Sequence, residues 1–243
     1  MTPRLFCPPP LAAGAEITLP QSAAHHATRV LRLQRGDALR LFDGEGGEFA
    51  AVLSRVEARA VIARLGEREL IERESPLAVT LVQGLAAAER MDYAIQKAVE
   101  LGVTAIAPVV TARGLTRLDA ARAQRRLEHW RAIAIASCEQ CGRNRLPRLH
   151  PPCDLSRWLR EPSTASLRIL LAPDGPSSLA QLARPEGTIE LLVGPEGGLE
   201  PEEAEAAVAA GFHTVRLGPR TLRTETAGPA MLSAMNALWG DWR

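Results

Sequence analysis

The sequence predicts an α/β protein in which a small β-rich unit precedes a larger unit of alternating strands and helices. Two observations lead to this fold class. Roughly the first seventy residues alternate apolar and polar side chains over short segments, which is typical of half-buried strands. From Leu77 onward, continuous apolar strands alternate with helical segments, and this pattern indicates a mainly parallel sheet. The chain has 243 residues, enough for one large domain or two smaller ones.

The N-terminal unit is expected to contain four strands and one helix. The strands are predicted at residues 16–19, 37–42, 48–56 and 60–65. The segment Asp43-Gly44-Glu45-Gly46-Gly47 is a strong turn signal between the second and third strands. Apolar residues recur at helical spacing within residues 21–33, which predicts a helix there. We expect these elements to form a small β-barrel.

The boundary between the two units is predicted from a change of composition. Residues 69–76 are charged and poor in apolar side chains, and Pro76 ends any helix that reaches it. We therefore expect domains at residues 1–72 and 73–243.

The C-terminal unit is expected to alternate strands and helices. Strands are predicted at residues 77–82, 103–110, 167–172, 188–193 and 213–217. Helices are predicted at residues 89–101, 119–137, 226–239 and between Pro201 and Gly211, where proline suits a helix start and glycine a helix end. One face of the first helix is apolar and should be buried; it carries Met91, Ile95, Ala98 and Val99.

The composition excludes several protein classes. Hydrophobic residues make up 46% of the chain and charged residues 23%, which argues against disorder. No apolar run approaches the ~20 residues that span a bilayer. The N-terminal residues lack the apolar core of a signal peptide. The sequence therefore predicts a cytoplasmic protein without a membrane partner.

The four cysteines allow two interpretations. Cys138-x-x-Cys141 followed by His150-x-x-Cys153 could hold zinc, but the second pair is short and flanked by prolines. Reduced thiols without a metal are the favoured interpretation, because four cysteines are too few for a disulfide scaffold at this length.

The basic residues are unevenly distributed although the net charge is only +1. Lys97 is the only lysine, so nearly every cation is an arginine, whose planar fork suits phosphate groups. Between residues 113 and 148, only Asp119, Glu128 and Glu139 oppose nine arginines, which are Arg113, Arg117, Arg122, Arg125, Arg126, Arg131, Arg143, Arg145 and Arg148. This segment is either a solvated helix face or a surface that contacts phosphates, and the sequence leaves both open.

Three loops that follow predicted strands are candidates for a binding site, because ligands of parallel sheets bind beyond the carboxyl ends of the strands. Gln83-Gly84 follows the first strand, Gly194-Pro195-Glu196-Gly197-Gly198 the fourth, and residues 218–226 the fifth. The glycines leave backbone amides uncovered, so a ligand can approach closely. The chain lacks a Gly-x-Gly-x-x-Gly fingerprint, a Walker A loop and a Gly-x-Ser-x-Gly elbow, so an ordinary nucleotide fold or a serine hydrolase is not supported.

Several segments together resemble the RsmE family of 16S ribosomal RNA methyltransferases, which belongs to the SPOUT class. The N-terminal segments are residues 3–6, 25–32, 36–37 and 42–44. The later ones are residues 91–103, the Glu-Gln-x-x-Arg segment at 139–143, and the two most specific motifs at 193–198 and 217–227.

This resemblance implies an N-terminal PUA-like RNA-binding domain and a C-terminal domain with a trefoil knot. It further implies a homodimer that binds S-adenosyl-L-methionine inside the knot and methylates N3 of a specific uridine in 16S rRNA, with the small ribosomal subunit as partner. A basic residue usually follows the first strand in the family, whereas this chain has Ala86-Ala87-Ala88, and Arg90 is expected to supply the charge. A non-catalytic RNA-binding protein and a SPOUT enzyme with another target remain the alternatives.

The resemblance and the residue chemistry assign candidate roles. Cofactor binding is expected from apolar walls, open glycines and the polar groups of Glu196 and Thr224; the full set is Leu171, Gly194, Pro195, Glu196, Gly197, Gly198, Leu217, Gly218, Leu222 and Thr224.

Catalysis requires that the N3 proton leave or that the resulting anion be stabilised. Arg220 and Arg223 are expected to stabilise that anion. Glu225 is the first candidate proton acceptor, with a plain helix N-terminal acid as the equally weighted alternative. The expected RNA contacts are Arg4, His25, Arg29, Arg32, Arg113 and Arg143.

Overall fold

A computed structural model describes residues 2–114 and 119–242, and its chain divides into two compact units. The first unit contains the residues up to Glu74 together with Cys138–Leu146. The second contains Ser75–Ser137 and the residues from Pro147 onward. The sequence predicted a single boundary between residues 72 and 73, which does not account for residues 138–146, since these belong to the first unit although they are far along the chain.

The described residues of the N-terminal unit form a five-stranded sheet of strand order β1-β3-β4-β5-β2. β1 runs parallel to β3, and the other pairs are antiparallel. The sheet encloses a core of Leu5, Leu39, Leu41, Leu53 and Ala63, each no more than 1% exposed. The strands are β1 (Arg4–Phe6), β2 (Glu16–Thr18), β3 (Ala38–Phe42), β4 (Glu48–Val56) and β5 (Val61–Glu69).

The helical segment of this unit differs from the single helix expected at residues 21–33. The chain forms α1 (Gln21–His25) and continues directly into the π-helical turn η1 (His26–Val30). Arg32 then adopts a left-handed backbone conformation with φ of 54°. The buried side of the segment, Ala23 and Ala27, packs on the sheet as the helical spacing predicts. The spacing of these buried residues predicts a helical segment but does not distinguish a π-helical turn from a regular α-helix.

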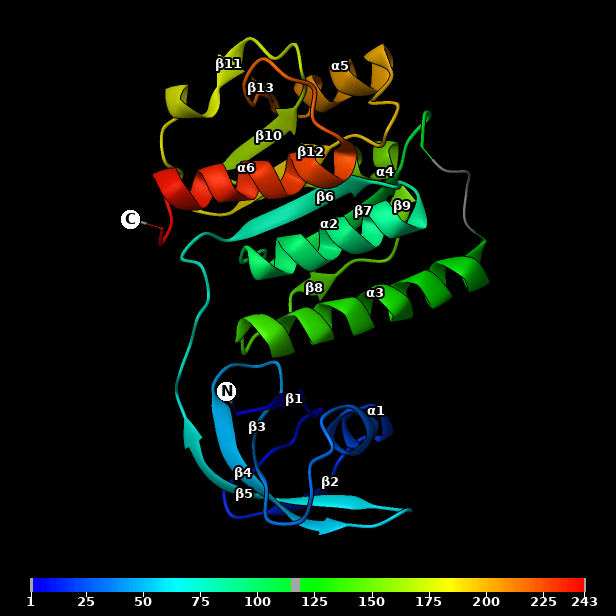
Figure 1. Cartoon of the computed structure of the whole chain (residues 1–243). Helices are drawn as coiled ribbons and strands as arrows, with labels where there is room; N and C mark the ends of the chain where they lie inside the picture. Colours follow the sequence, from blue (N-terminus) through cyan, green and yellow to red (C-terminus); the bar gives the residue numbers. More distant parts are fainter. Residues whose placement is uncertain (1, 115–118, 243) are drawn as a thin grey trace. The chain divides into compact units, whose positions relative to one another are not determined.

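The C-terminal unit contains an eight-stranded parallel sheet among its described residues, with the order β11-β13-β10-β12-β6-β7-β8 and β9 beside β7 (Figure 1). The five longer strands match the predicted ones closely. The strands are β6 (Val79–Gly84), β7 (Ala105–Val110), β8 (Arg148–Leu149), β9 (Cys153–Asp154), β10 (Leu167–Leu171), β11 (Ser177–Ser178), β12 (Ile189–Val193) and β13 (His213–Arg216).

Helices cover both faces of this sheet, which explains why its central strands are apolar on both sides. In Figure 1, α2 (Ala88–Glu100) and α6 (Thr224–Leu238) lie side by side on one face. The other face packs against α4 (Leu155–Arg160) and α5 (Pro201–Ala209) through a core that includes Val82, Leu170 and Leu192.

The predicted apolar face of α2 is confirmed, because Met91, Ile95, Ala98 and Val99 are buried. The long helix α3 (Ala120–Cys141) was predicted to turn Leu127, Trp130 and Ala134 inward; Trp130 and Ala134 are buried, whereas Leu127 is only partly buried. Its last residues belong to the N-terminal unit. The short helix α4 and the 3₁₀ turn η2 (Leu179–Gln181) were not expected, because segments this short carry no full helical period.

A buried asparagine joins the end of α2 to α6. Asn236 is 3% exposed. Its Nδ2 donates to the Leu101 carbonyl at 2.9 Å, and its Oδ1 accepts from Ser75 Oγ at 2.8 Å. Since Leu101 is the residue where α2 ends, this side chain fixes the register of the two helices that cover one face of the sheet.

We expect Asn236→Leu to lower the free energy of unfolding by about 1–3 kcal/mol, because the Leu101 carbonyl and the Ser75 hydroxyl lose their partner in a buried position. Ser75→Ala removes only one of these bonds and should cost less. Urea denaturation of the purified variants, followed by circular dichroism, measures both effects. Equal stability of Asn236→Leu and the wild type would contradict this account.

Candidate functional site

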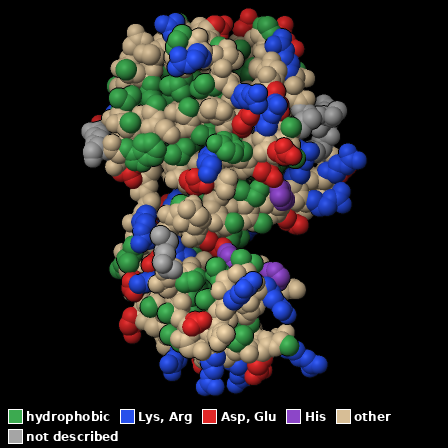
Figure 2. All heavy atoms as spheres, viewed as in Figure 1, with side chains coloured by type: hydrophobic (Ala, Val, Ile, Leu, Met, Phe, Trp, Pro, Cys, Tyr) green, Lys and Arg blue, Asp and Glu red, His purple; other side chains and the backbone are tan. Residues whose placement is uncertain are grey.

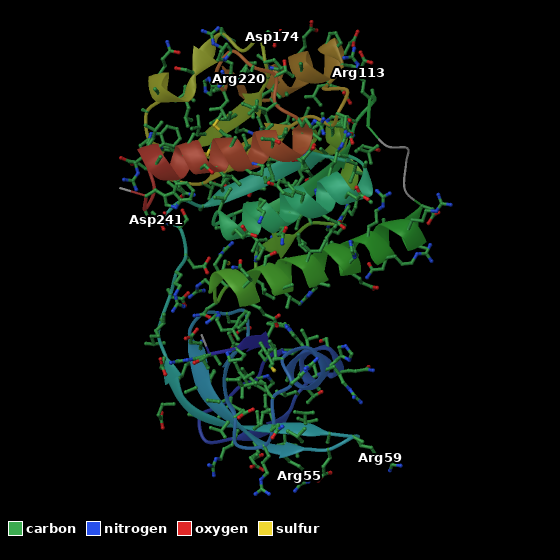
Figure 3. The ribbon with its side chains drawn as sticks, viewed as in Figure 1. Arg55, Arg59, Arg113, Asp174, Arg220 and Asp241 are labelled. Carbon is green, nitrogen blue, oxygen red and sulfur yellow. The ribbon has the colours of Figure 1, made fainter. Side chains whose placement is uncertain are left out.

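The loops after β10, β12 and β13 meet at the carboxyl ends of the parallel strands and enclose a cavity of about 610 Å³. Figure 3 shows Asp174, Arg113 and Arg220 at this end of the C-terminal unit. Such a volume is typical of a site for a small organic ligand. The lining residues are Arg90, Arg113, Leu170, Leu171, Ala172, Pro173, Asp174, Val193, Gly194, Pro195, Glu196, Gly198, Leu199, Pro201, Ala204, Leu217, Gly218, Arg220, Thr221, Leu222, Arg223, Thr224 and Ala227.

The structure brings most of the residues predicted to bind a cofactor into this one cavity. Nine of the ten line it: Leu171, Gly194, Pro195, Glu196, Gly198, Leu217, Gly218, Leu222 and Thr224. The tenth, Gly197, does not line the cavity, because its carbonyl accepts a hydrogen bond from Arg113 at 3.2 Å and its α-carbon faces that side chain. Arg220 and Arg223 line the cavity as well.

Thr224, the first residue of α6, holds two of the loops together. Its hydroxyl donates to the Gly194 carbonyl at 2.6 Å and accepts from Gln83 Nε2 at 2.9 Å. Thr224 and Gln83 are both buried. One hydroxyl therefore connects the end of β6, the loop after β12 and the start of α6.

Gly84 permits a close approach between the end of β6 and the loop after β12. A Cβ atom at this position would lie 2.6 Å from the Pro195 nitrogen and 2.9 Å from the Gly194 carbonyl carbon. Both neighbours are backbone atoms, so no side chain fits without moving the loop. This contact gives a reason for the Gln83-Gly84 pair, which forms the last two residues of β6 and does not follow the strand as the sequence predicted.

Glu196 ties the loop after β12 to the start of α2. Its Oε1 accepts from the Ala87 backbone N–H at 2.8 Å and lies 3.1 Å from an Arg90 guanidinium nitrogen. Burial alone would raise the pKa of Glu196, but the hydrogen bond from Ala87, its own backbone N–H and the charge of Arg90 lower that pKa overall. Glu196 is therefore a charged anchor at neutral pH.

Arg90 lies between two carboxylates at the cavity wall. In addition to Glu196, its Nε lies 3.9 Å from Glu225 Oε2. Glu225 does not line the cavity, and no hydrogen-bond donor among the described residues reaches its buried Oε2. The expectation that Arg90 places a positive charge beside this site agrees with its position.

Several lining residues were not predicted from the sequence, and Asp174 is chemically the most informative of them. It follows β10 in the segment Leu171-Ala172-Pro173-Asp174 and is exposed. The rule that ligands bind beyond the carboxyl ends of parallel strands applies to β10 as it does to β12 and β13, and would have identified it.

Arg113, which was predicted to contact RNA, is exposed and forms an ion pair with Glu200. It lines the cavity, and its Nε lies 2.8 Å from Glu200 Oε1. The hydrogen bond with Glu200 raises the pKa of Arg113. Its guanidinium therefore braces the loop after β12. Arg117, which belongs to the same arginine-rich segment, lies outside the described residues.

Arg143 and Arg4 form a polar network within the N-terminal unit. Arg143 is 3% exposed, and its Nε donates to Glu74 Oε2 at 2.9 Å. Arg4 pairs with Glu48 and donates to the Arg143 carbonyl at 3.0 Å and to Asn144 Oδ1 at 2.7 Å.

The predicted phosphate contact of Arg143 does not suit this burial, because a guanidinium enclosed by the protein cannot reach RNA. Arg4, whose side chain is 10% exposed, is also mainly structural. The Glu-Gln-x-x-Arg segment contributes to the same interior, since Glu139 Oε1 accepts from the Phe6 backbone N–H at 2.9 Å.

The other predicted RNA contacts are exposed. His25 and Arg29 line a second cavity of about 740 Å³, which lies within the N-terminal unit. Arg32 follows them at the surface.

The cysteines do not form a ligand cluster in the described part of the chain. Cys138 and Cys141 belong to the N-terminal unit, whereas His150 and Cys153 belong to the C-terminal unit. Burial raises the pKa of the Cys7 and Cys138 thiols to about 12 in each case. Among the described residues, no group of three or more His, Cys, Asp or Glu side chains is arranged to hold a metal ion.

None of the helices in the described part of the chain is both long enough and apolar enough to cross a membrane.

Comparisons with known proteins agree with the geometry of this site. Residues 73–236 match the family described as an RNA methyltransferase domain, and residues 19–66 match the RNA methyltransferase PUA domain. A protein of Synechocystis named ribosomal RNA small subunit methyltransferase E is 34% identical over 98% of this chain and 78% of its own length.

The chain belongs to the ribosomal RNA small subunit methyltransferase E family. The Bacillus subtilis member is 32% identical over 87% of this chain and 86% of its own. A solved structure of the Neisseria gonorrhoeae member, bound to S-adenosyl methionine, is 38% identical, covers 100% of both chains and superposes with a TM-score of 0.93. A Legionella pneumophila chain that holds the bound cofactor SAM is 36% identical, covers 99% of both chains and has a TM-score of 0.96.

We expect Gly84→Ala to lower the free energy of unfolding of this family member by about 1–3 kcal/mol, because the new methyl group displaces the backbone of the loop after β12. Gly228→Ala is the matched control. Gly228 lies inside α6, and a Cβ atom there would make only an ordinary contact of 3.4 Å with Leu81 of β6. The substitution should therefore be neutral or stabilising. Thermal denaturation of the two variants distinguishes a specific close approach from a general intolerance of added methyl groups.

Proposed function

We propose that this protein transfers the methyl group of S-adenosyl-L-methionine to N3 of one specific uridine in the 16S rRNA of the small ribosomal subunit. The main observation behind this proposal is the cavity formed by the loops after three adjacent parallel strands, with the buried hydroxyl of Thr224 at its wall. Support comes from the named relatives, which align with the chain over nearly its whole length, and from the Neisseria relative, whose structure was determined with S-adenosyl methionine bound.

The residues of the cavity fit such a cofactor. Leu171, Leu217 and Leu222 provide apolar walls for an adenine ring, and Gly194, Gly198 and Gly218 leave backbone groups accessible. Asp174 and Glu196 are the lining carboxylates. Because Arg90 already pairs with Glu196, Asp174 is the carboxylate that would attract the amino and sulfonium cations of the ligand. We assign Gly197 an indirect role through Arg113.

The cofactor, when bound, supplies an electrophilic methyl carbon on a sulfonium sulfur. Uracil N3 forms the new bond to this carbon, the carbon–sulfur bond breaks, and the sulfur keeps the electron pair. The N3 proton passes to a base, for which Glu225 is our candidate. Arg220 and Arg223 line the cavity and stabilise the negative charge that develops on the uracil carbonyl oxygens.

Arg90 completes this group of charges. Because it lies beside both Glu196 and Glu225, it orients the candidate base relative to the loop after β12. The buried Oε2 of Glu225 has no hydrogen-bond partner in this structure, so a substrate bound beside Arg90 would supply one.

RNA binding is assigned mainly to residues 1–72, with methyl transfer and the knot expected from the family in residues 73–243. Within the first domain we retain Arg29, Arg32 and His25 as RNA contacts because they are exposed.

We further propose a cytoplasmic homodimer. Figure 2 shows hydrophobic side chains gathered over the exposed face of α2 and α6, and Tyr93 and Leu238 on these helices are 48% and 44% exposed.

The methyl donor can be tested through Thr224. We expect Thr224→Val to weaken binding of S-adenosylmethionine in calorimetric titrations by about tenfold or more, because two hydrogen bonds that shape the cavity are lost. Thr224→Ser keeps the hydroxyl and should bind nearly as well as the wild type. Preferential binding of ATP, or no binding of S-adenosylmethionine by the wild type, would refute the proposed function.

The proton acceptor can be tested through Glu225. We expect Glu225→Gln to lower the single-turnover rate on small ribosomal subunits by about 100-fold or more while the affinity for S-adenosylmethionine is retained. Glu202→Gln is the matched control, because Glu202 is also an acid in the first turn of a helix but is exposed on α5, whereas Glu225 is partly buried beside Arg90. Near-normal turnover of Glu225→Gln at saturating cofactor and RNA would exclude it as the base.

A further inference from the structure

The second cavity, here called the N-terminal cleft, lies within the N-terminal unit between the helical segment α1–η1 and the turn that joins β4 to β5. It has a volume of about 740 Å³. Figure 3 shows Arg59 in the β4–β5 turn and Arg55 near the end of β4. The lining residues are Thr18, Leu19, Gln21, Ala24, His25, Thr28, Arg29, Val56, Glu57, Ala58, Arg59, Ala60 and Val61.

The cleft combines an apolar floor with a polar rim. Leu19 and Val61 are 4% and 6% exposed and belong to the hydrophobic core beneath the cleft. His25, Arg29 and Arg59 are exposed around it. An apolar floor accepts the flat face of a ring, whereas an imidazole and guanidinium groups at the rim suit ring edges and phosphates.

The charges around the cleft favour an anionic ligand. Arg29 and Arg59 line it from opposite sides, one from the helical segment and one from the hairpin. Glu57 is the only carboxylate among the lining residues, and its Oε1 lies 3.6 Å from Arg55 Nε. The negative charge of Glu57 is therefore partly offset by a neighbour, and the rim has a net positive charge.

The backbone beside the cleft departs from regular helix. The π-helical turn His26–Val30 widens the helix where Arg29 projects, and Arg32 adopts a left-handed conformation two residues beyond that turn. π-Helical turns and left-handed non-glycine residues are conformationally costly and concentrate at binding sites. Val30 is 61% exposed next to Arg29, which adds apolar surface outside the cleft.

We propose that the N-terminal cleft binds one unstacked nucleotide of the substrate RNA, with its base on the floor near Leu19 and Val61 and its flanking phosphates at Arg29 and Arg59. This inference rests on the proposed function, because it specifies how the RNA substrate of that reaction is held. A single-stranded RNA segment should bind in the cleft better than a duplex does, because only an unpaired base can leave its stack and enter the cleft.

The experiment uses the full chain and fluorescein-labelled single-stranded RNA of about eight nucleotides, with a duplex of the same length as competitor. His25→Ala and Arg59→Ala should each weaken binding of the single strand about fivefold or more in fluorescence anisotropy, because stacking and phosphate contacts are lost. Arg64→Ala is the matched control, since Arg64 is an exposed arginine of β5 in the same unit that does not line the cleft.

A second measurement locates the RNA directly. Oligonucleotides that carry 4-thiouridine should crosslink to peptides containing residues 18–29 and 56–61 of the wild type. Unchanged affinity in His25→Ala and Arg59→Ala, or crosslinks confined to other peptides, would overturn the proposal. Stronger competition by an acidic peptide or by duplex RNA than by the single strand would also overturn it.

Methylation of small ribosomal subunits is measured in the same preparations to separate the two proposals. We expect His25→Ala and Arg59→Ala to raise KM for the subunit while kcat is largely retained, because the cleft binds RNA without touching the reacting atoms. If the wild type methylates and the cleft variants behave like Arg64→Ala, only the cleft proposal fails. If the wild type neither methylates nor binds S-adenosylmethionine, the proposed function fails whatever the RNA affinities are.

Discussion

The buried hydroxyl of Thr224 is the contact on which the cavity of the C-terminal unit depends. It donates to the loop after β12 and accepts from the side chain at the end of β6, while its own backbone begins α6. Loops at the end of a parallel sheet have no hydrogen-bonded partner strand to hold them, so they need such cross-links to keep one conformation. Gly84 allows this arrangement because it brings the β6 terminus within contact of Gly194 and Pro195.

The charged residues around the cavity follow from the same arrangement. Glu196 can bind the Ala87 N–H only because the loop after β12 passes the start of α2. The same passage places Arg90 beside Glu196 and Glu225. The packing of this loop against the start of α2 therefore both fixes the loop's conformation and positions the charged side chains beside the cavity.

Burial separates the enclosed arginines from the exposed ones, and Arg113 is exposed but ion-paired with Glu200. Arg143 and Arg4 are enclosed and satisfy Glu74, Glu48 and Asn144 within the N-terminal unit. Arg113 braces the loop after β12 through Glu200. Arg29, Arg32 and Arg59 are exposed. Counting arginines along the chain could not make this distinction, since a guanidinium paired with a buried carboxylate and one in solvent contribute the same formal charge.

The sequence by itself determined the fold class, the five long strands of the parallel sheet, the buried face of α2 and the two glycine-containing loops, because each depends on local periodicity or on glycine's backbone freedom. The family could also be inferred, since its motifs are contiguous. Only the tertiary structure decided that Gly197 and Glu225 do not line the cavity, that Arg143 is buried, that Asp174 joins the site, and that α1 widens into a π-helical turn. These properties depend on contacts between residues far apart in the chain, such as Arg90 with Glu196 and Arg113 with Glu200, and no local pattern encodes them.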